Sequence, residues 1–291
     1  MTGTVQSRPA AALRLLEIDA GWVAGRGAIS LPERVAMVQQ AGAFGSVALY
    51  HALIAVAQAV EADGAALACR GGELPYHNRD HIHDVLMAWG QLCATGLTGL
   101  DAEAQGSVLA ALIAHDLAHD GTINRHPYEL EARAWRAIHP VLEQAGVPPA
   151  VQRTIRATIL ATDPASYRRW GAGACADTPL RRGFKLAVAA DLFASLLPGH
   201  GFAQGALLAR EQAGAGLPDR AAALQTLAGR AAFLRHVPEL GPAAEACGLP
   251  DLIAHQLAVI AALDEADRDR AWNPAHGAAF VAAVAGSLAA A

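Results

Sequence analysis

Apolar residues recur along most of the chain at the three- and four-residue spacing that places them on one face of a helix. Sustained alternation of apolar and polar residues, the pattern of a half-buried strand, does not occur in the sequence. Helices are predicted at residues 32–41, 47–60, 80–94, 101–118, 128–145, 149–161, 180–196, 220–236, 250–263 and 274–289. The fold is therefore predicted to be all-α.

The two ends of the chain differ in pattern. Residues 1 to about 30 are predicted to be loosely organised, because Gly21, Gly25 and Gly27 would interrupt a long helix. At the other end, Asn273 is predicted to be an N-cap that starts a helix. The apolar stretch after it is shorter than the roughly 20 residues of a membrane span, so we expect a terminal helix packed on the domain or on a second subunit.

Composition narrows the class of protein. Apolar residues make up 53% of the chain and charged residues 17%, as in a globular protein. One compact helical domain is the simplest organisation, with residues 1–70 as a helical N-terminal region and residues 71–291 as the catalytic region. The net charge of −5, without any basic run, argues against binding to a nucleic-acid polymer.

The expected compartment is the cytoplasm. Charged residues interrupt the apolar residues near the N-terminus, so no signal-peptide core is predicted. Four cysteines are scattered without a CxxC pair, as expected for reduced thiols: Cys69, Cys93, Cys175 and Cys247. We expect no membrane partner.

The strongest chemical signal lies in residues 110–124, which read AALIAHDLAHDGTIN. His115 and Asp116 stand at the end of an apolar, helical run, where an unpaired charge would be costly. His119 is predicted one turn later on the same helix face, with Gly121 ending the helix and Asn124 in the loop. A metal ion is the simplest partner for this group.

Two further positions fit the same chemistry. Residues 76–85 read YHNRDHIHDV, with His77 and His81 four residues apart, so His81 lies on the inner face if this segment is helical. Asp191 follows an apolar helical run that begins near Lys185, so its carboxylate also needs a partner.

These strings resemble the catalytic domain of class I 3′,5′-cyclic nucleotide phosphodiesterases, within the HD superfamily of metal-dependent phosphohydrolases. The family strings are YHNxxHxxDV and HDxxHxGxxN, and every fixed position is met here. Residues 159–163 and 189–192 resemble the family's Leu-Ala-Thr-Asp and Ala-Asp-Leu strings. The resemblance implies an all-α, multi-helix HD-type domain with a two-metal site.

The resemblance also implies a ligand set and two ions. The ligands would be His81, His115, Asp116 and Asp191, a set that suits Zn²⁺, Mn²⁺ or Fe²⁺ at the first site. Asp116 would bridge to a second, mostly water-coordinated Mg²⁺ or Mn²⁺. Such a pair can lower the pKa of a bridging water and clamp a phosphoryl group, so the implied reaction is hydrolysis of a cyclic nucleotide to its 5′-monophosphate.

Further roles follow from the resemblance alone. His77 would be the general acid that protonates the leaving 3′ oxygen, and His119 would hold a metal-bound water or a phosphate oxygen. Thr162 and a glutamate, for which Glu129 is preferred over Glu131, would hold water on the second ion. Asp84 and Asn124 would orient neighbouring groups without binding metal.

The base pocket departs from the family pattern. Family members carry Gln-x-x-Phe, whereas this chain has Arg230 where the Gln should stand and Phe233 as the stacking residue. Tyr76 is a further candidate substrate contact. A guanidinium donates hydrogen bonds but cannot accept them, so weak discrimination between cyclic AMP and cyclic GMP, or preference for another phosphoester, is predicted.

Other readings stay open from the sequence. HD-type folds also house di-iron oxygenases, and His126 and His139 could supply the additional histidines that such an enzyme needs. A phosphohydrolase acting on another phosphoester or nucleotide and a non-catalytic metal sensor are the remaining alternatives. In each enzymatic case the partner is a small molecule, and a homodimer is compatible with the sequence.

Overall fold

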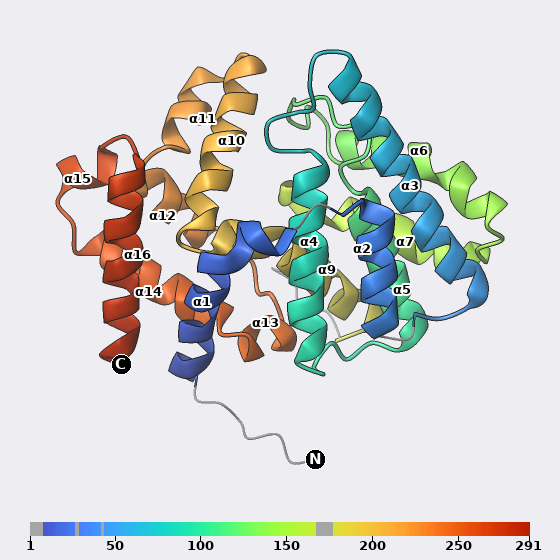
Figure 1. Ribbon diagram of the computed structural model, residues 1–291, viewed down its shortest axis with the longest axis horizontal. Helices are drawn as coiled ribbons and strands as arrows, with labels where there is room; N and C mark the ends of the chain where they lie inside the picture. Colours follow the sequence, from blue (N-terminus) through green and yellow to red (C-terminus); the bar gives the residue numbers. More distant parts are fainter. Residues whose placement is uncertain (1–7, 27–28, 42–43, 167–176) are drawn as a thin grey trace.

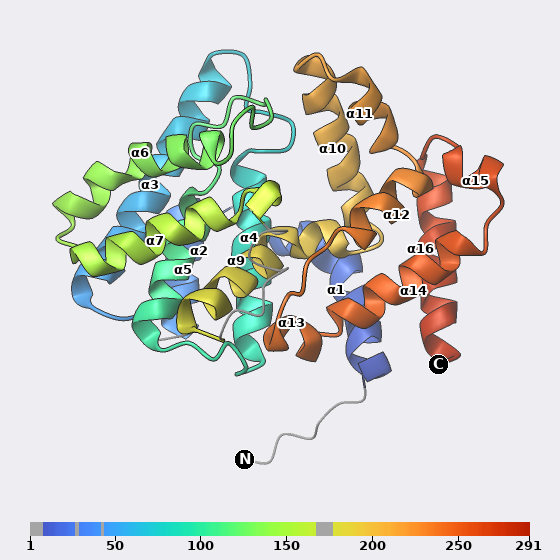
Figure 2. The ribbon, with the colours of Figure 1, turned by 180° about the vertical axis from the view of Figure 1, so that it is seen from behind.

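The computed structural model describes residues 8–26, 29–41, 44–166 and 177–291 (Figures 1 and 2). In these ranges the chain forms helices and no strand, apart from one isolated β-bridge between Thr226 and Ala271. The all-α prediction is confirmed. Cys69, Cys93 and Cys247 are free thiols, whereas Cys175 lies outside the described residues.

One group of helices surrounds α5, which is buried from Gly106 to Ala114. The neighbours that pack on α5 are α3, α4, α6, α7 and α9. The bounds of this group are α2 Leu31–Ala41, α3 Val47–Cys69, α4 Arg79–Ala94, α5 Ala102–Ala114, α6 Glu129–Gln144, α7 Pro149–Ala161 and α9 Pro179–Leu196. A Cβ atom on Gly106 would lie 2.6 Å from Leu49 Cδ2, so this glycine permits the close approach of α3 to α5.

Short polar side chains set where these helices begin. Asn78 caps α4 by accepting from the amide of His81, and Asp101 caps α5 by accepting from the amide of Ala104. These caps place the starts of α4 and α5 within one residue of the predicted starts. The predicted helix over residues 47–60 is real but continues to Cys69 as α3.

α3 is the one described helix with the length and composition of a possible membrane span. α9 and α10 reach the length and composition of a span only when they are taken together, and the chain bends by 95° between them. α3 packs against α2, α5 and α6, and it carries polar residues such as Gln58 and Glu61 along its length. The core helix of a globular protein can have the same length and composition, so these two properties alone do not identify a span.

A second group of helices forms the other side of the molecule (Figure 2). Its members are α10 His200–Gly214, α11 Pro218–Ala223, α12 Leu227–Arg235, α13 Pro242–Ala246, α14 Leu249–Ala261, α15 Glu265–Asp269 and α16 Pro274–Ala289. α16 begins where predicted, with Asn273 accepting from two amides, and packs on α1 and α14. α1 (Arg8–Arg26) also contacts α4 and α10, so it bridges the two groups.

The prediction of a loosely organised start is wrong for the described part of that segment, because α1 is a 19-residue helix that includes Gly21 and Gly25. A glycine in a helix costs about 1 kcal/mol relative to alanine, and tertiary packing can offset that amount. Leu15 and Trp22 are both 2% exposed, and Trp22 stacks on Phe193 of α9 at 5.5 Å. Gly27 lies outside the described residues.

Two other boundaries differ from prediction. The single helix predicted at residues 220–236 is divided into α11 and α12, because Thr226 caps a new helix by accepting from the amide of Gly229. α10 was not predicted, although it is 15 residues long. The helix predicted to reach residue 118 ends at Ala114, with consequences for the site described next.

Candidate metal site and its neighbours

Four of the predicted site residues meet where α4, α5 and α9 pack together. His81 Nε2 lies 3.1 Å from Asp191 Oδ1 and 3.3 Å from Asp116 Oδ2. His115 Nε2 lies 3.3 Å from the same Asp191 oxygen and 3.2 Å from the same Asp116 oxygen. Two imidazole nitrogens and two carboxylate oxygens therefore converge in one place.

The donor set fits a metal ion. Ligand atoms about 2.0–2.1 Å from one ion lie about 3.0–3.4 Å from their neighbours, which matches the separations in this group. His115 Nδ1 donates to the carbonyl oxygen of Leu112 at 2.8 Å, which leaves Nε2 free to face the carboxylates. Asp116 Oδ2 is buried without a hydrogen bond in the described part of the chain, which is costly unless a cation or a proton compensates.

The pKa shifts within this group also favour the binding of a cation. Burial alone would raise the pKa of Asp116, but His115, His77 and His81 outweigh burial and hold the pKa well below its usual range. Burial alone would lower the pKa of His115, whereas Asp116 and Asp191 raise it well above its usual range. The raised pKa means that, without a metal, the His115 imidazole holds its proton between the two carboxylates. A metal ion that binds here would replace that proton, so binding would release it.

A second candidate group lies beside the first and contains His77, His119 and Glu211. His77 Nδ1 lies 2.5 Å from Glu211 Oε1, and the rings of His77 and His119 stack with their centroids 3.8 Å apart and their planes 18° apart. His119 Nδ1 accepts a hydrogen bond from the amide of Gly121 at 3.0 Å. Each residue offers a ligand atom, so this group could also hold a metal ion.

The geometry of the second group is nevertheless better suited to a proton than to an ion. The 2.5 Å separation is shorter than the spacing of two ligands around one ion and is that of a short hydrogen bond between the His77 ring and the Glu211 carboxylate. Burial lowers the pKa of His77, but Asp116 and Glu211 outweigh it, and the net pKa is raised. Burial and the neighbouring His77 lower the pKa of His119 to about 4, so His77 is the ring of the stacked pair that holds a proton more readily.

His119 does not lie on the predicted helix face. α5 ends at Ala114, and the chain turns through residues 115–118, with Ala118 in the left-handed region at φ 62°. This turn carries His119 away from His115 and places it against His77. Gly121 is not the helix C-cap, although its φ of 77° explains why a glycine stands there.

Glu211 was missed by the sequence analysis. It comes from α10, is 4% exposed, and accepts from the amides of Tyr76 and His77 at 3.0 and 3.1 Å besides the imidazole. No motif surrounds it, and it lies between the specific strings of the family resemblance, which end near Asp191, and the weaker match around Arg230 and Phe233. Its position depends on how α10 packs, which local sequence does not encode.

The structure favours Glu131 over the predicted Glu129 near the metal group. Glu129 Oε2 accepts from the amide of Arg125 at 3.2 Å and holds the loop before α6. Glu131 is 8% exposed, and Asn124 joins it through a 2.9 Å hydrogen bond from Nδ2. Burial, with the charges of Asp163 and Asp116, raises the pKa of Glu131, so the charge of Asp116 in the metal group acts on this carboxylate.

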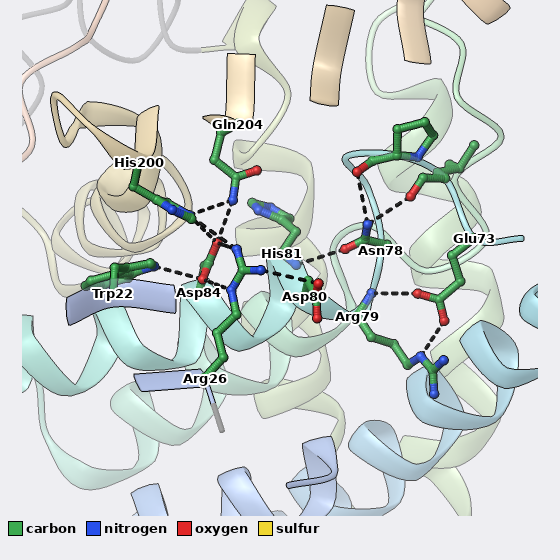
Figure 3. A network of polar contacts seen from close by, with 12 residues as sticks. Trp22, Arg26, Glu73, Asn78, Arg79, Asp80, His81, Asp84, His200 and Gln204 are labelled. Atoms are coloured by element: carbon green, nitrogen blue, oxygen red, sulfur yellow. Dashed lines mark hydrogen bonds and ion pairs between the residues drawn. The ribbon is translucent and has the colours of Figure 1, made fainter. Parts of the chain in front are cut away.

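Thr162 and Asp84 have contacts within the protein. Thr162 Oγ1 donates to the carbonyl oxygen of Ile159 at 2.7 Å where α7 ends, so its role toward a bound water stays a prediction. Asp84 is fully buried in a separate network with Trp22, Arg26, His200 and Gln204 (Figure 3). A role of Asp84 in orienting groups at the metal site stays a prediction.

The predicted base pocket is not formed as expected. Arg230 is 6% exposed, and its three guanidinium nitrogens donate to Gln256 Oε1 and to backbone carbonyl oxygens at the end of α9. The prediction that Arg230 contacts a nucleotide base is therefore replaced by a structural role. Phe233 is partly buried against the core. Tyr76 packs its ring on His77 and His81 at 4.7 and 4.9 Å and bonds Ser195 through its hydroxyl, so it supports the histidines.

Arg230→Met is expected to lower the free energy of unfolding by about 2–4 kcal/mol, because buried acceptors lose their donors. Urea denaturation followed by circular dichroism measures the change. Arg235→Met, which alters an exposed arginine on the same helix, is the control and should change stability by less than about 0.5 kcal/mol. Equal stability of the two variants would refute the structural role of Arg230.

The two histidines that the sequence offered for an oxygenase, His126 and His139, lie in neither candidate group. His126 is exposed, and His139 lies on the outer side of α6, where it packs against Trp135 and faces Glu143. Instead, a hollow lined by α3, the start of α4, Asp116 and His119 opens beside the two groups. Arg79 borders the hollow and is paired with Glu73 (Figure 3). It is also paired with Glu61.

Comparison with protein-family models, curated proteins and solved structures found no match to this chain. The site therefore has to be interpreted from its own chemistry: a compact all-helical chain with buried His/Asp and His/Glu groups that could hold a metal ion.

Proposed function

We propose that this protein is a metal-dependent phosphodiesterase that hydrolyses a 3′,5′-cyclic nucleotide to its 5′-monophosphate. One observation carries the proposal: a four-residue donor set for a cation lies beside an imidazole, His77, that is held by a buried carboxylate. Hydrolysis of a phosphodiester needs both functions, since the phosphoryl oxygens must be stabilised and the leaving oxygen must receive a proton.

His81, His115, Asp116 and Asp191 would hold the first ion, for which Zn²⁺ suits the donors and Fe²⁺ is also compatible. A second ion, Mg²⁺ or Mn²⁺, would share Asp116, with Glu131, Asn124 and Thr162 around its waters. When bound, such ions polarise the phosphoryl group and make water a better nucleophile. The chain's own contribution is to hold these donors in a buried place before the ion arrives.

His77 supplies the proton in this proposal. Glu211 binds Nδ1, so Nε2 is the nitrogen left to donate to the leaving 3′ oxygen as the P–O3′ bond breaks. Water adds its hydroxyl to phosphorus, and the 3′ oxygen leaves as a hydroxyl. His119, neutral and stacked on His77, keeps the charged ring in place and can offer Nε2 to a phosphate oxygen.

A panel assay tests the proposal. Chelator-treated protein should be inactive, and Zn²⁺ with Mg²⁺ or Mn²⁺ should restore hydrolysis of cyclic AMP, cyclic GMP or both. The products, separated by chromatography, should be 5′-monophosphates. Asp116→Asn protein, purified identically, controls for contaminating phosphodiesterase.

Two outcomes would contradict the proposal. Tight metal binding with no hydrolysis of any cyclic or linear phosphodiester would favour a metal-binding sensor. Hydrolysis of another phosphoester, with cyclic nucleotides untouched, would keep the hydrolase chemistry but refute the substrate.

A further inference from the structure

α1 makes polar contacts with α4 and α10 that lie outside the two groups of the candidate site. Asp84 of α4 accepts from Trp22 Nε1 at 2.8 Å and from two nitrogens of Arg26, each at 2.7 Å. The same carboxylate lies 2.6 Å from Gln204 Nε2 and 3.0 Å from His200 Nε2, both on α10 (Figure 3). A single buried carboxylate thus joins three helices.

α1 also completes the start of α10. Gly199, the residue before α10, has no side chain with which to cap that helix. The carboxylate of Asp19 on α1 takes that place by accepting from the amides of Gly199 at 2.6 Å and His200 at 2.8 Å. A Cβ atom on Gly199 would lie 2.9 Å from Asp19 Oδ2, so the glycine makes room for this contact.

The C-terminal part of α10, which carries Glu211, reaches the candidate site. Glu211 comes seven residues after Gln204, which is about two helical turns, so both side chains lie on the same face of α10. Along the segment that leads into α4 the order is reversed. Asp84 of α4, which meets Gln204, comes seven residues after His77, which precedes α4 and meets Glu211. α10 is therefore tied to the α4 segment at two levels, by Asp84 at one and by Glu211 at the other.

The close packing at the junction between α9 and α10 should make α10 move as one rigid helix. The two helices meet at 95°, and a Cβ atom on Gly201 would lie 2.3 Å from the carbonyl oxygen of Ser195. Arg230 holds the carbonyl oxygens of Ser195, Leu196 and Leu197 at this junction. A change in the first turn of α10 would thus be carried along the helix to Glu211.

We infer that α1 is a positioning helix of the candidate site: Asp19, Trp22 and Arg26 place α10, and α10 places His77 through Glu211. The inference rests on the proposed role of His77 as the proton donor. The Asp19 carboxylate contacts the start of α10, whereas all four predicted metal ligands lie on α4, on α9 or directly after α5. Removing that carboxylate should therefore impair proton donation and leave metal binding intact.

The test compares Asp19→Ala with Asp264→Ala, since both remove a carboxylate that accepts backbone amides at a helix start. For Asp19→Ala, kcat on a cyclic nucleotide should fall about 10- to 100-fold, the order expected from misplacing a catalytic group. Activity on bis(p-nitrophenyl) phosphate, whose leaving group needs little protonation, should fall less than 3-fold, with metal content unchanged. Asp264→Ala should match the wild type on both substrates.

A second readout needs no substrate. The short His77 Nδ1–Glu211 hydrogen bond should give a downfield proton resonance that Glu211→Gln removes. This resonance should shift or broaden in Asp19→Ala and stay unchanged in Asp264→Ala. The resonance tests the role of α1 even if neither phosphodiester proves to be a substrate. A failure of this inference can therefore be told apart from a failure of the proposed function.

Two results would overturn the inference. One is an unchanged resonance with wild-type activity on both substrates in Asp19→Ala. The other is an equal loss on both substrates together with loss of metal, which would show a general structural role. Asp19→Asn keeps one acceptor oxygen, so it should also lose more activity on the cyclic nucleotide than on bis(p-nitrophenyl) phosphate, with a smaller loss than Asp19→Ala. It replaces the alanine variant if that protein unfolds.

Discussion

Asp116→Asn is expected to lose tight metal binding and at least about 10³-fold of hydrolytic activity. Asp116 Oδ2 is close to both imidazole nitrogens, and it is buried without a hydrogen bond in the described structure. An amide retains the shape but removes the charge on which a cation depends. Metal content by mass spectrometry and the rise in melting temperature on adding Zn²⁺ measure the loss, because a ligand stabilises only the state that binds it.

Asp120→Asn is the matched control. Asp120 lies four residues further along the same loop, but its side chain pairs with Thr122 and Arg133. This variant should keep its metal and its thermal response to Zn²⁺. If Asp116→Asn retains wild-type affinity for two ions per chain, Asp116 is not a shared ligand and the interpretation of this group is wrong.

The first group could be predicted because its chemistry is visible locally. His115 and Asp116 directly follow an apolar, buried helix, and a charged side chain at the end of such a helix requires a partner where the helix packs. The caps of α4 and α5 are equally local, since Asn78 and Asp101 bond amides three residues away. Such features depend on a few neighbouring residues, and the sequence therefore locates them well.

The second group depends on tertiary structure. His119 reaches His77 only because α5 stops at Ala114 and Ala118 takes a left-handed conformation, for which an alanine gives no signal. Glu211 reaches His77 only because α1 and the α9–α10 junction orient α10. The glycines of α1 suggested a loosely organised segment, yet packing of buried residues such as Trp22 decided the outcome.

Arg230 shows how a resemblance can assign a role that burial excludes. The family pattern placed this residue in a base pocket, whereas its guanidinium holds the end of α9. The same junction orients α10, so Arg230, like α1, helps to position His77 through α10. Specificity for the base, if a base is bound, must come from other residues.

His77→Ala is expected to keep the metal and to lose about 10²–10⁴-fold of kcat on a cyclic nucleotide, the usual contribution of a general acid. Metal retention follows because His77 contributes no atom to the four-residue group. On bis(p-nitrophenyl) phosphate the loss should be much smaller, since a nitrophenolate leaves without protonation. His126→Ala, which removes an exposed histidine, should change neither activity. Equal losses on the two substrates, or loss of metal, would show that His77 is a ligand or a structural residue.

The partner variant Glu211→Gln gives the corresponding pH dependence. A general acid works while it is protonated, so activity falls as pH rises through the pKa of His77. Burial lowers that pKa, and Asp116 and Glu211 raise it by more. Once a cation neutralises Asp116, Glu211 is the carboxylate that remains to raise it. Glu211→Gln should therefore move the alkaline fall of kcat to lower pH, as measured from pH 5 to 10 on a cyclic nucleotide. An unmoved alkaline limb would show that another group donates the proton.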